Sequence, residues 1–454
     1  MPPLIFQIDE LLRSVVDELV ATDRGAAVAF ALTCRMVEEP TLSLLWRRQH
    51  RLGTLSEVFS SPTCPADLDY HSHVVSSSRS GSCSTTNLFR ITQLTGHCPL
   101  VGNRAKLKRY ASWMRGLDLP SNLASTNATL SLLLRNFPGD ALFPNLERLD
   151  CIILPSKYCD QREPEELQNA LSTLVCQCGP SLRRLKTLVP LSEEAILHLA
   201  KLPNVSYWGT PHGPPQSLPK LAFPSLEWLR LDELEALPWL NLLASHEYGM
   251  PQDRLATPPR SARDRLKTLE YFGDTINIDR SQFLSPVAKF RNLVTLRVKS
   301  KCSSSCSFRL TDDDVRSLAT ELSRLELLHL GAPCSSGTCY NTAASLMSIS
   351  LRCVDLEDLE IHFNTQSITR DMQHLLDRGA MYGGVRSKVR CLSVGNLPLG
   401  PEDSEDYKTV AKGLKCIFPE LSHLLTDTAL TAWSCVMVEL YGECWNTDDE
   451  SVEL

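Results

Sequence analysis

Leu293-Val294-Thr295-Leu296-Arg297-Val298 is a short pattern that the chain repeats at a nearly constant interval. Apolar residues occupy its first, fourth and sixth positions, and the arrangement recurs from Leu325, Leu356 and Val389, with a shorter copy from Leu421. The first positions are 32, 31, 33 and 32 residues apart. Self-similarity at a fixed period predicts supersecondary units that stack on one another.

Each copy has the periodicity of a strand with one buried face, and the residues between copies have the periodicity of a helix. Thr311 precedes Asp312, Asp313 and Asp314, which supply an N-cap oxygen and three carboxylates to the positive end of a helix. The next two intervals also carry an apolar helical face, formed by Ile368, Met372, Leu375 and Leu376 in one and by Tyr407, Val410, Leu414 and Ile417 in the other. Strand, turn and helix at this interval resemble a leucine-rich repeat solenoid, which implies an α/β fold with parallel strands inside and helices outside.

The repeats depart from that pattern in length. Leucine-rich repeats usually span about 20 to 29 residues, and the asparagine expected after the last strand position appears only at Asn364. We therefore expect an irregular array over residues 121–427, with a surface loop inserted at about 245–263, where prolines and charges accumulate. Residues 428–454 should form a C-terminal cap followed by an acidic tail, because the last repeat would otherwise expose its core.

Composition excludes several classes of protein. The net charge is -7, with 46 basic and 53 acidic side chains, which gives no overall attraction to nucleic acid or to an anionic membrane. The first residues lack a secretory signal, and no apolar run approaches the ~18 to 20 residues of a membrane span. Seventeen cysteines form an odd number, and many stand singly at expected core positions such as Cys34, Cys353 and Cys391. These features predict reduced thiols and a cytoplasmic or nuclear location.

The first 55 residues form a separate unit of three predicted helices. Leu11, Leu12, Val15, Val16 and Leu19 make an amphipathic stripe, residues 26–34 are small and apolar, and Pro40 is expected to open a third helix that carries Leu42, Leu45 and Trp46. Three short helices bury little surface by themselves. A partner is therefore expected.

This unit resembles an F-box. The residues that carry the resemblance are Gln7-Ile8-Asp9-Glu10-Leu11-Leu12-Arg13-Ser14-Val15-Val16-Asp17-Glu18-Leu19, Ala31-Leu32-Thr33-Cys34-Arg35, Glu39-Pro40-Thr41-Leu42 and Leu45-Trp46. They are most similar to the divergent F-boxes of mushroom-type (basidiomycete) fungi, although Gln7-Ile8 replaces the Leu-Pro opening of the family. The resemblance implies docking to a Skp-type adaptor, and through it to a cullin-RING ubiquitin ligase. It assigns adaptor binding to Ile8, Leu11, Leu12, Val15 and Val16. The alternative is a small helical cap that packs on the repeats.

Two segments join this unit to the array. Residues 56–103 are rich in Ser, Thr and Pro and predict a loop or linker. Residues 104–120 predict a basic amphipathic connector helix with Leu107, Tyr110, Ala111 and Met114 inward. A similar helix couples the F-box to the repeats in the fungal proteins that the chain resembles. Contact with phosphate or a membrane is the alternative for its basic face.

We find no catalytic motif in the sequence and expect no enzyme activity and no cofactor. The inner face of the repeats is the expected target-binding surface, because strand alternation places outward the residues Trp228, Arg230, Glu270, Arg297, His329 and Glu360. Mixed charge with an exposed tryptophan is typical of a protein-binding face.

A metal site is a second hypothesis, based on Cys302, Cys306, Cys334 and Cys339, which follow two consecutive predicted strands. If those repeats stack in register, the four thiolates could bind zinc, and a disulfide is the other alternative. The spacing is looser than that of a zinc knuckle, so we adopt free thiols and no metal.

The sequence therefore predicts the substrate-recognition subunit of an SCF-type cullin-RING E3 ubiquitin ligase. In this interpretation the F-box docks the adaptor and the repeats bind a protein target, while nucleic acid and membranes are not partners. The alternative is a non-catalytic leucine-rich repeat scaffold or interaction protein with a degenerate F-box.

Overall fold

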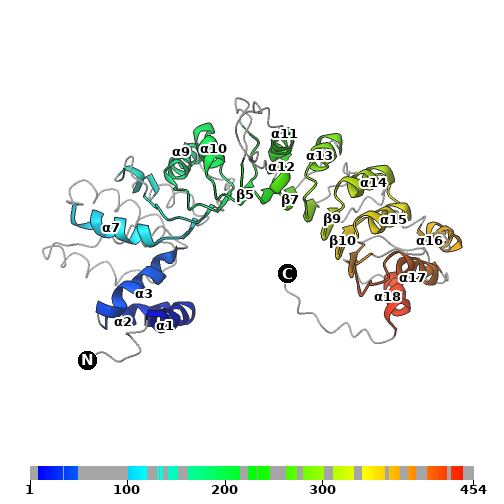
Figure 1. The fold of residues 1–454 in the computed structure, drawn as a ribbon, viewed down its shortest axis with the longest axis horizontal. Helices are drawn as coiled ribbons and strands as arrows, with labels where there is room; N and C mark the ends of the chain where they lie inside the picture. Colours follow the sequence, from blue (N-terminus) through cyan, green and yellow to red (C-terminus); the bar gives the residue numbers. More distant parts are fainter. Residues whose placement is uncertain are drawn as a thin grey trace, which may run out of the picture. The chain divides into compact units, whose positions relative to one another are not determined.

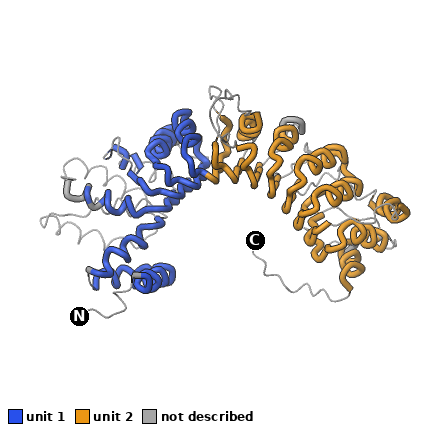
Figure 2. Tube along the Cα trace, in the orientation of Figure 1, with its two compact units in different colours: residues 1–205 blue, residues 206–454 orange. Residues whose placement is uncertain are grey.

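The computed structural model describes most of the predicted elements and leaves several segments undescribed. The described residues are 9–33, 35–49, 101–119, 130–131, 133–135, 137, 142–151, 162–214, 223–232, 234–245, 262–273, 280–300, 310–331, 340–362, 368–378, 387–394, 406–426 and 431–442. The Ser/Pro-rich segment, the loop insertion and the acidic tail lie almost entirely outside these ranges. Within them the chain alternates short strands with helices (Figure 1). It forms two compact units, residues 1–205 and 206–454 (Figure 2).

The first unit opens with three helices, α1 (Asp9–Thr22), α2 (Arg24–Ala31) and α3 (Arg35–Arg47). Asp23 caps α2, because its carboxylate accepts a hydrogen bond of 3.0 Å from the Ala26 N–H. Leu12, Val16 and Val37 form a small core, on which Val20, Phe30 and Leu44 pack. The third helix begins five residues before Pro40, so the expectation that Pro40 opens it is wrong. Packing of Val37 against α1 favours the helix on the N-terminal side of that proline.

The rest of the first unit is a parallel sheet with helices. It contains β1 (Arg48–Gln49), α7 (Val101–Trp113), β2 (Gly116–Leu119), β3 (Arg148–Cys151), α9 (Arg162–Gln177), β4 (Arg184–Thr187) and α10 (Glu193–Lys201). Strand β2 pairs in parallel with β1 and β3, and β3 also pairs in parallel with β4. Parallel strands are therefore already present at Arg48–Gln49 and at Gly116–Leu119, and the second of these strands lies within the segment expected to be a connector.

Helix α7 links the N-terminal helices to this sheet. Leu107, Ala111 and Met114 are fully buried, as the amphipathic pattern predicts. Tyr110 stacks on Trp46 of α3 with ring centroids 4.9 Å apart, and Arg109 pairs with Glu39 at 3.4 Å. The inward face of the connector thus contacts the last of the three helices.

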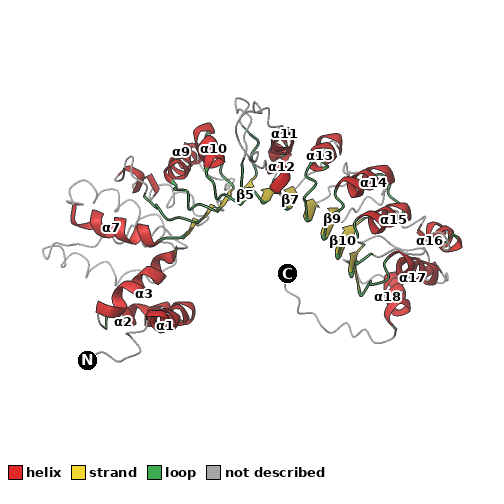
Figure 3. Ribbon diagram, viewed as in Figure 1, coloured by secondary structure: helices red, strands yellow, loops and turns green. Residues whose placement is uncertain are grey.

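The described residues of the second unit include eight parallel strands, which pair in chain order. The strands are β5 (Tyr207–Thr210), β6 (Trp228–Leu231), β7 (Thr268–Gly273), β8 (Thr295–Ser300), β9 (Leu327–Gly331), β10 (Asp358–Ile361), β11 (Cys391–Ser393) and β12 (His423–Leu425). The helical segments are η3 (Leu234–Ala236), α11 (Pro238–Ala244), α12 (Ala262–Arg265), α13 (Arg280–Val287), α14 (Asp312–Glu321), α15 (Ala343–Arg352), α16 (Ile368–Asp377), α17 (Asp406–Ile417) and α18 (Thr431–Tyr441). Figure 3 shows these helices along one side of the row of strands. The α/β class and the parallel strands are confirmed, and the arrangement is consistent with a repeat solenoid.

Each repeat is joined to the next by two recurring contacts. The middle apolar position of each strand is buried in register, at Leu229, Leu269, Leu296, Leu328, Leu359 and Leu392. In addition, the carbonyl before a strand accepts two backbone N–H groups of the following repeat, as when Lys267 accepts from Val294 and Thr295 at 2.7 and 2.9 Å. The same double acceptance recurs at Val294, Glu326, Glu357 and Arg390. These contacts satisfy the backbone groups where each strand begins.

Helix ends follow the sequence signals. Thr311 and Asp314 form a reciprocal capping box at the start of α14, as the run of three aspartates predicts. At the C-terminal side, in the segment expected to cap the array, α18 buries Trp433 and Val436 completely. Among the helices that the structure describes, none combines the length and the apolar character that crossing a bilayer requires.

Candidate functional site

The outward-facing residues of the second unit form two rows across the strands, because the parallel register aligns equivalent positions. The first row contains Trp228, Thr268, Thr295, Leu327, Asp358, Cys391 and His423. The second row contains Arg230, Glu270, Arg297, His329, Glu360 and Ser393. All six residues expected to bind a target lie in these two rows, and five of them share the second row.

Charged side chains of the second row are paired with close neighbours. Arg230 forms an ion pair of 2.7 Å with Asp232, and its guanidinium lies 4.1 Å from the centre of the Phe272 ring. Arg297 contacts Glu270 at 3.3 Å, and the Glu270 carboxylate is almost fully buried. Glu270 is therefore not available to a target, which corrects the expectation. Strand alternation gives the direction of its Cβ, whereas the longer Arg297 covers its carboxylate.

His329 lies between two carboxylates of the next strand. Its Nε2 is 3.0 Å from Asp358, and its Nδ1 is 3.3 Å from Glu360. Burial raises the pKa of the Asp358 carboxyl, but the hydrogen bond and charge of His329 oppose this, with help from Cys391 and Arg297, and the net shift is downward. Only about an eighth of the His329 side chain (12%) is exposed, so this residue joins β9 to β10 more than it faces solvent.

Trp228 is the large apolar side chain of the target-binding prediction that remains accessible. It is 38% exposed and meets the edge of Tyr207, with ring centroids 5.1 Å apart. Arg297 keeps a similar exposed fraction above Glu270. Exposed aromatic and arginine side chains are those that most often contribute binding energy in protein interfaces. The accessible part of the predicted target-binding face is thus narrower than its full list of residues.

The first unit carries a charged row that the sequence analysis did not identify. Arg48, Arg148 and Arg184 occupy one register row of β1, β3 and β4, and Asp118 and Asp150 lie two residues further along β2 and β3. The alternation Arg148-Leu149-Asp150 was the available signal. We name the three arginines the guanidinium row.

The N-terminal helices expose a set of large apolar side chains, which we name the apolar helical surface: Leu11, Val15, Val28, Leu32 and Met36. Leu32, at the end of α2, is 81% exposed. Leu12 and Val16 lie instead in the helical core, which corrects the expectation that they face an adaptor. Each is one residue, or about 100° around the helix, from its exposed neighbour Leu11 or Val15, so the two pairs form separate stripes of α1. Ile8 lies outside the described residues.

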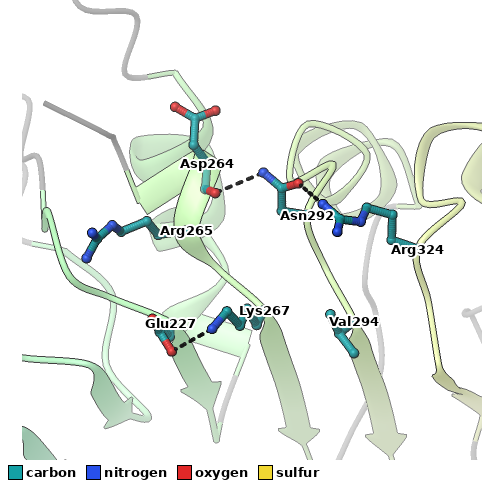
Figure 4. A pocket seen from close by; sticks show the side chains of 7 residues that line it. All are labelled: Glu227, Asp264, Arg265, Lys267, Asn292, Val294 and Arg324. Carbon is teal, nitrogen blue, oxygen red and sulfur yellow. Dashed lines mark hydrogen bonds and ion pairs between the residues drawn. The ribbon is translucent and has the colours of Figure 1, made fainter. Parts of the chain in front are cut away.

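An open hollow of about 300 Å³ lies where strands β6 to β9 begin (Figure 4). In Figure 4, Lys267 reaches Glu227 at 3.1 Å, while Asn292 donates to the Asp264 carbonyl at 2.9 Å and accepts from Arg324 at 2.9 Å. These contacts link successive repeats. They present no nucleophile beside a base and therefore suggest a structural role.

Metal binding has no support among the described residues, where no group of three or more His, Cys, Asp or Glu side chains is arranged to hold an ion. Cys302, Cys306, Cys334 and Cys339, the hypothetical zinc ligands, lie outside the described ranges. Cys353 is fully buried, and burial raises its pKa to about 12. Cys391 was expected in the core but is half-buried in the first row. Its pKa is raised to about 11 by burial and by the nearby Asp358.

Comparison with known proteins gives no family for this chain: no protein-family model matches it, and no match appears among curated proteins.

Proposed function

We propose that the chain is the substrate-recognition subunit of an SCF-type cullin-RING ubiquitin ligase. In this proposal the N-terminal helices dock a Skp-type adaptor, and the repeats bind a protein target in the cytoplasm or nucleus. Catalysis belongs to other subunits of the ligase. The chain contributes proximity between the target and the ubiquitin-transferring machinery.

The observation that carries this proposal is the apolar helical surface. Leu11, Val15, Val28, Leu32 and Met36 expose large apolar side chains on helices that share only a small core. Removing such side chains from water is favourable by roughly 25 cal/mol for each Å² buried, so a partner that covers them gains binding energy. The likeness of residues 7–46 to an F-box makes a Skp-type adaptor the expected partner.

A scaffold role without an adaptor is the second candidate. The Trp46–Tyr110 stack and the pairing of β1 with β2 connect the N-terminal helices directly to the repeats, as a structural cap would require. In that case the apolar helical surface would contact another protein, or the F-box resemblance would be a relic.

Co-purification of the full chain with the Skp-type adaptor of the same organism tests the proposal. The informative variant is Leu11→Asp/Val15→Asp, because both side chains are exposed and the added charges should abolish binding without disturbing the core. Arg13→Asp is the matched control, because it changes the charge of the same helix by the same two units at an exposed position on another side of the helix from Leu11 and Val15. Leu12→Asp is unsuitable as a probe of the interface, because it places a carboxylate in the helical core.

Wild type and Arg13→Asp should bind the adaptor, and Leu11→Asp/Val15→Asp should not, with the same melting temperature for all three. Failure of the wild-type chain to bind the adaptor would reject the ligase proposal and leave the scaffold role.

A further inference from the structure

The guanidinium row has the geometry of an anion-binding surface. Arg48, Arg148 and Arg184 are aligned by the register of β1, β3 and β4, and Gly116 occupies the equivalent position of β2. Neighbouring strands lie about 4.8 Å apart, so Arg48 is roughly two strand spacings from Arg148, and Arg148 is one spacing from Arg184. The absence of a side chain at Gly116 gives Arg48 room, because a Cβ there would lie 3.3 Å from the Arg48 Cγ.

Two carboxylates form ion pairs with these arginines. Asp118 contacts Arg48 at 3.2 Å and Arg148 at 3.6 Å, and Asp150 contacts Arg148 and, at 3.3 Å, Arg184. The side chains of Arg48, Arg148 and Arg184 are 53%, 34% and 35% exposed, whereas that of Asp150 is 4% exposed. The guanidinium groups therefore face solvent and the Asp150 carboxylate lies beneath them.

The charge balance of this face is positive. Its outward strand positions carry four cations, with Lys186 as the fourth, against the two carboxylates of Asp118 and Asp150. The whole chain, in contrast, has a net charge of -7. A local excess of arginine on an acidic protein favours a partner with local negative charge and does not attract polyanions in general.

We propose that the guanidinium row binds an acidic segment of a protein, with carboxylates or phosphoryl groups spaced along an extended chain. The arginine fork matches both groups, and carboxylates that already orient the guanidinium planes reduce the entropy lost on binding. A protein segment is favoured over nucleic acid, because Asp118 beside the row and the acidic chain around it oppose a long polyanion. If the proposed function holds, this acidic segment belongs to the protein target that the repeats bind. Binding of the segment itself does not require the proposed function.

The test is fluorescence anisotropy with the full chain and three labelled peptides in which glycine alternates with glutamate, phosphoserine or serine. The glutamate and phosphoserine peptides should bind, and their ratio identifies carboxylate or phosphate as the preferred group. The serine peptide should not bind. No adaptor is present, so failure here is independent of failure of adaptor docking.

The variant Arg48→Gln/Arg184→Gln should weaken binding of the acidic peptides about tenfold, which corresponds to ~1.4 kcal/mol. It leaves Arg148 to pair with Asp150, which protects the fold, and a melting curve verifies this. Arg291→Gln/Arg390→Gln is the matched control, because it removes the same charge from exposed positions of the second unit and should bind like wild type. If the double variant does not fold, Arg48→Gln alone should weaken binding about threefold, because Arg48 is the most exposed of the three arginines in the guanidinium row.

Absence of binding by both acidic peptides, or equal weakening in the two double variants, overturns the proposal. Tighter binding of a single-stranded oligonucleotide of similar length also overturns it, in favour of a nucleic-acid ligand.

Discussion

Short acidic residues on the outward side of these strands lie beneath long basic ones. Glu270 is covered by Arg297 in the second unit, and Asp150 by Arg148 in the first. Each carboxylate is nearly buried and depends on the cation above it for compensation of its lost hydration. Such arginines have two roles: they compensate the charge of a nearly buried carboxylate, and their exposed side faces the solvent that a partner would displace.

Replacing Arg297 with alanine should reduce the free energy of unfolding by about 1–3 kcal/mol, because the buried Glu270 carboxylate loses its cation. Urea denaturation measures the loss. The double variant Glu270→Gln/Arg297→Met should regain most of it, since no charge then remains buried. If the change in unfolding free energy of the double variant equals the sum of the changes in Glu270→Gln and Arg297→Met within about 0.5 kcal/mol, the two residues are not coupled.

Stability should depend on pH through Asp358, whose pKa is lowered from its usual value of 3.8. Burial alone would raise the pKa, but His329 and its other neighbours outweigh burial. A carboxyl group whose pKa is lower in the folded than in the unfolded protein stabilises the fold when it is ionised. This contribution is complete at pH values above the pKa of the unfolded state, and it is lost as the pH falls through the pKa of the folded state. Wild type should therefore exceed Asp358→Asn in stability at pH 6.

Chemical denaturation from pH 6 to below pH 3.8 should show this difference shrinking as the pH falls. Asp355→Asn is the comparison variant, because Asp355 pairs with Lys388 at an exposed site, and its effect at pH 6 should be much smaller. A difference for Asp358→Asn that stays constant over this range would contradict the assignment.

The sequence predicted the direction of these side chains but not their accessibility. Alternation places Glu270 and Glu360 on the same side of their strands, and the structure agrees. Alternation does not show, however, which long side chain of the next repeat covers a given carboxylate. For Glu270 this side chain is Arg297, 27 residues later, and the contact depends on how the two strands align. The division of α1 into an exposed and a buried stripe depends in the same way on where α3 packs.

At the scale of elements, the start of α14 also caps the next helix. Asp312 accepts hydrogen bonds of 2.8 Å from both the N–H and the hydroxyl of Thr342, the N-cap of α15, and a further one from the Ser345 hydroxyl. Thr311 and Asp314 meanwhile cap α14 itself. One acidic run thereby fixes two consecutive helices.

Asp312→Ala should lower the free energy of unfolding by about 1–3 kcal/mol, because it leaves the start of α15 without its acceptor. Asp313→Ala is the neighbouring control, because the Asp313 side chain is 85% exposed and pairs with Arg316, which is itself half-exposed, so the change should stay within about 0.5 kcal/mol. Thermal and urea denaturation distinguish the two. Equal effects would mean that Asp312 acts through the helix dipole alone and not through contact with the next repeat.

Elements with a local or repeated signal were predicted well, whereas the short strands β1 and β2, which lie outside the repeated pattern, were not. Helix α14 has a cap, a first turn of aspartates and an apolar face, so its sequence alone locates it. Strands β1 and β2 span two and four residues, which is too short for alternation to be distinguished from chance. Strand β1 pairs with β2, and β2 with β3, and the order of residues along the chain does not reveal these contacts.

At the scale of the whole molecule, the repeats behave as units that contact mainly their neighbours. The interval of 31 to 33 residues predicted this architecture, because only stacking buries the apolar side of each unit. Function is less accessible from the sequence, since the proposed binding surfaces combine side chains that are far apart in the sequence, such as those of the guanidinium row. The resemblance of the first residues to an F-box supplies the hypothesis, and the apolar helical surface supplies a physical reason for a partner.

Nearest-neighbour stacking also predicts how damage at one end should spread. Trp433 of α18 is fully buried against the end of the second unit, and α18 packs on α17. Trp433→Ala should cost about 3–5 kcal/mol, and the loss should be concentrated in the neighbouring repeats. Hydrogen exchange followed by mass spectrometry should show faster exchange in α17 and β12 and little change in β6 to β8. Val438→Ala, at a half-exposed position of the same helix, is the control and should leave exchange unchanged. Uniform loss of protection across the second unit would mean that it unfolds as a single cooperative block, contrary to the independent-repeat description.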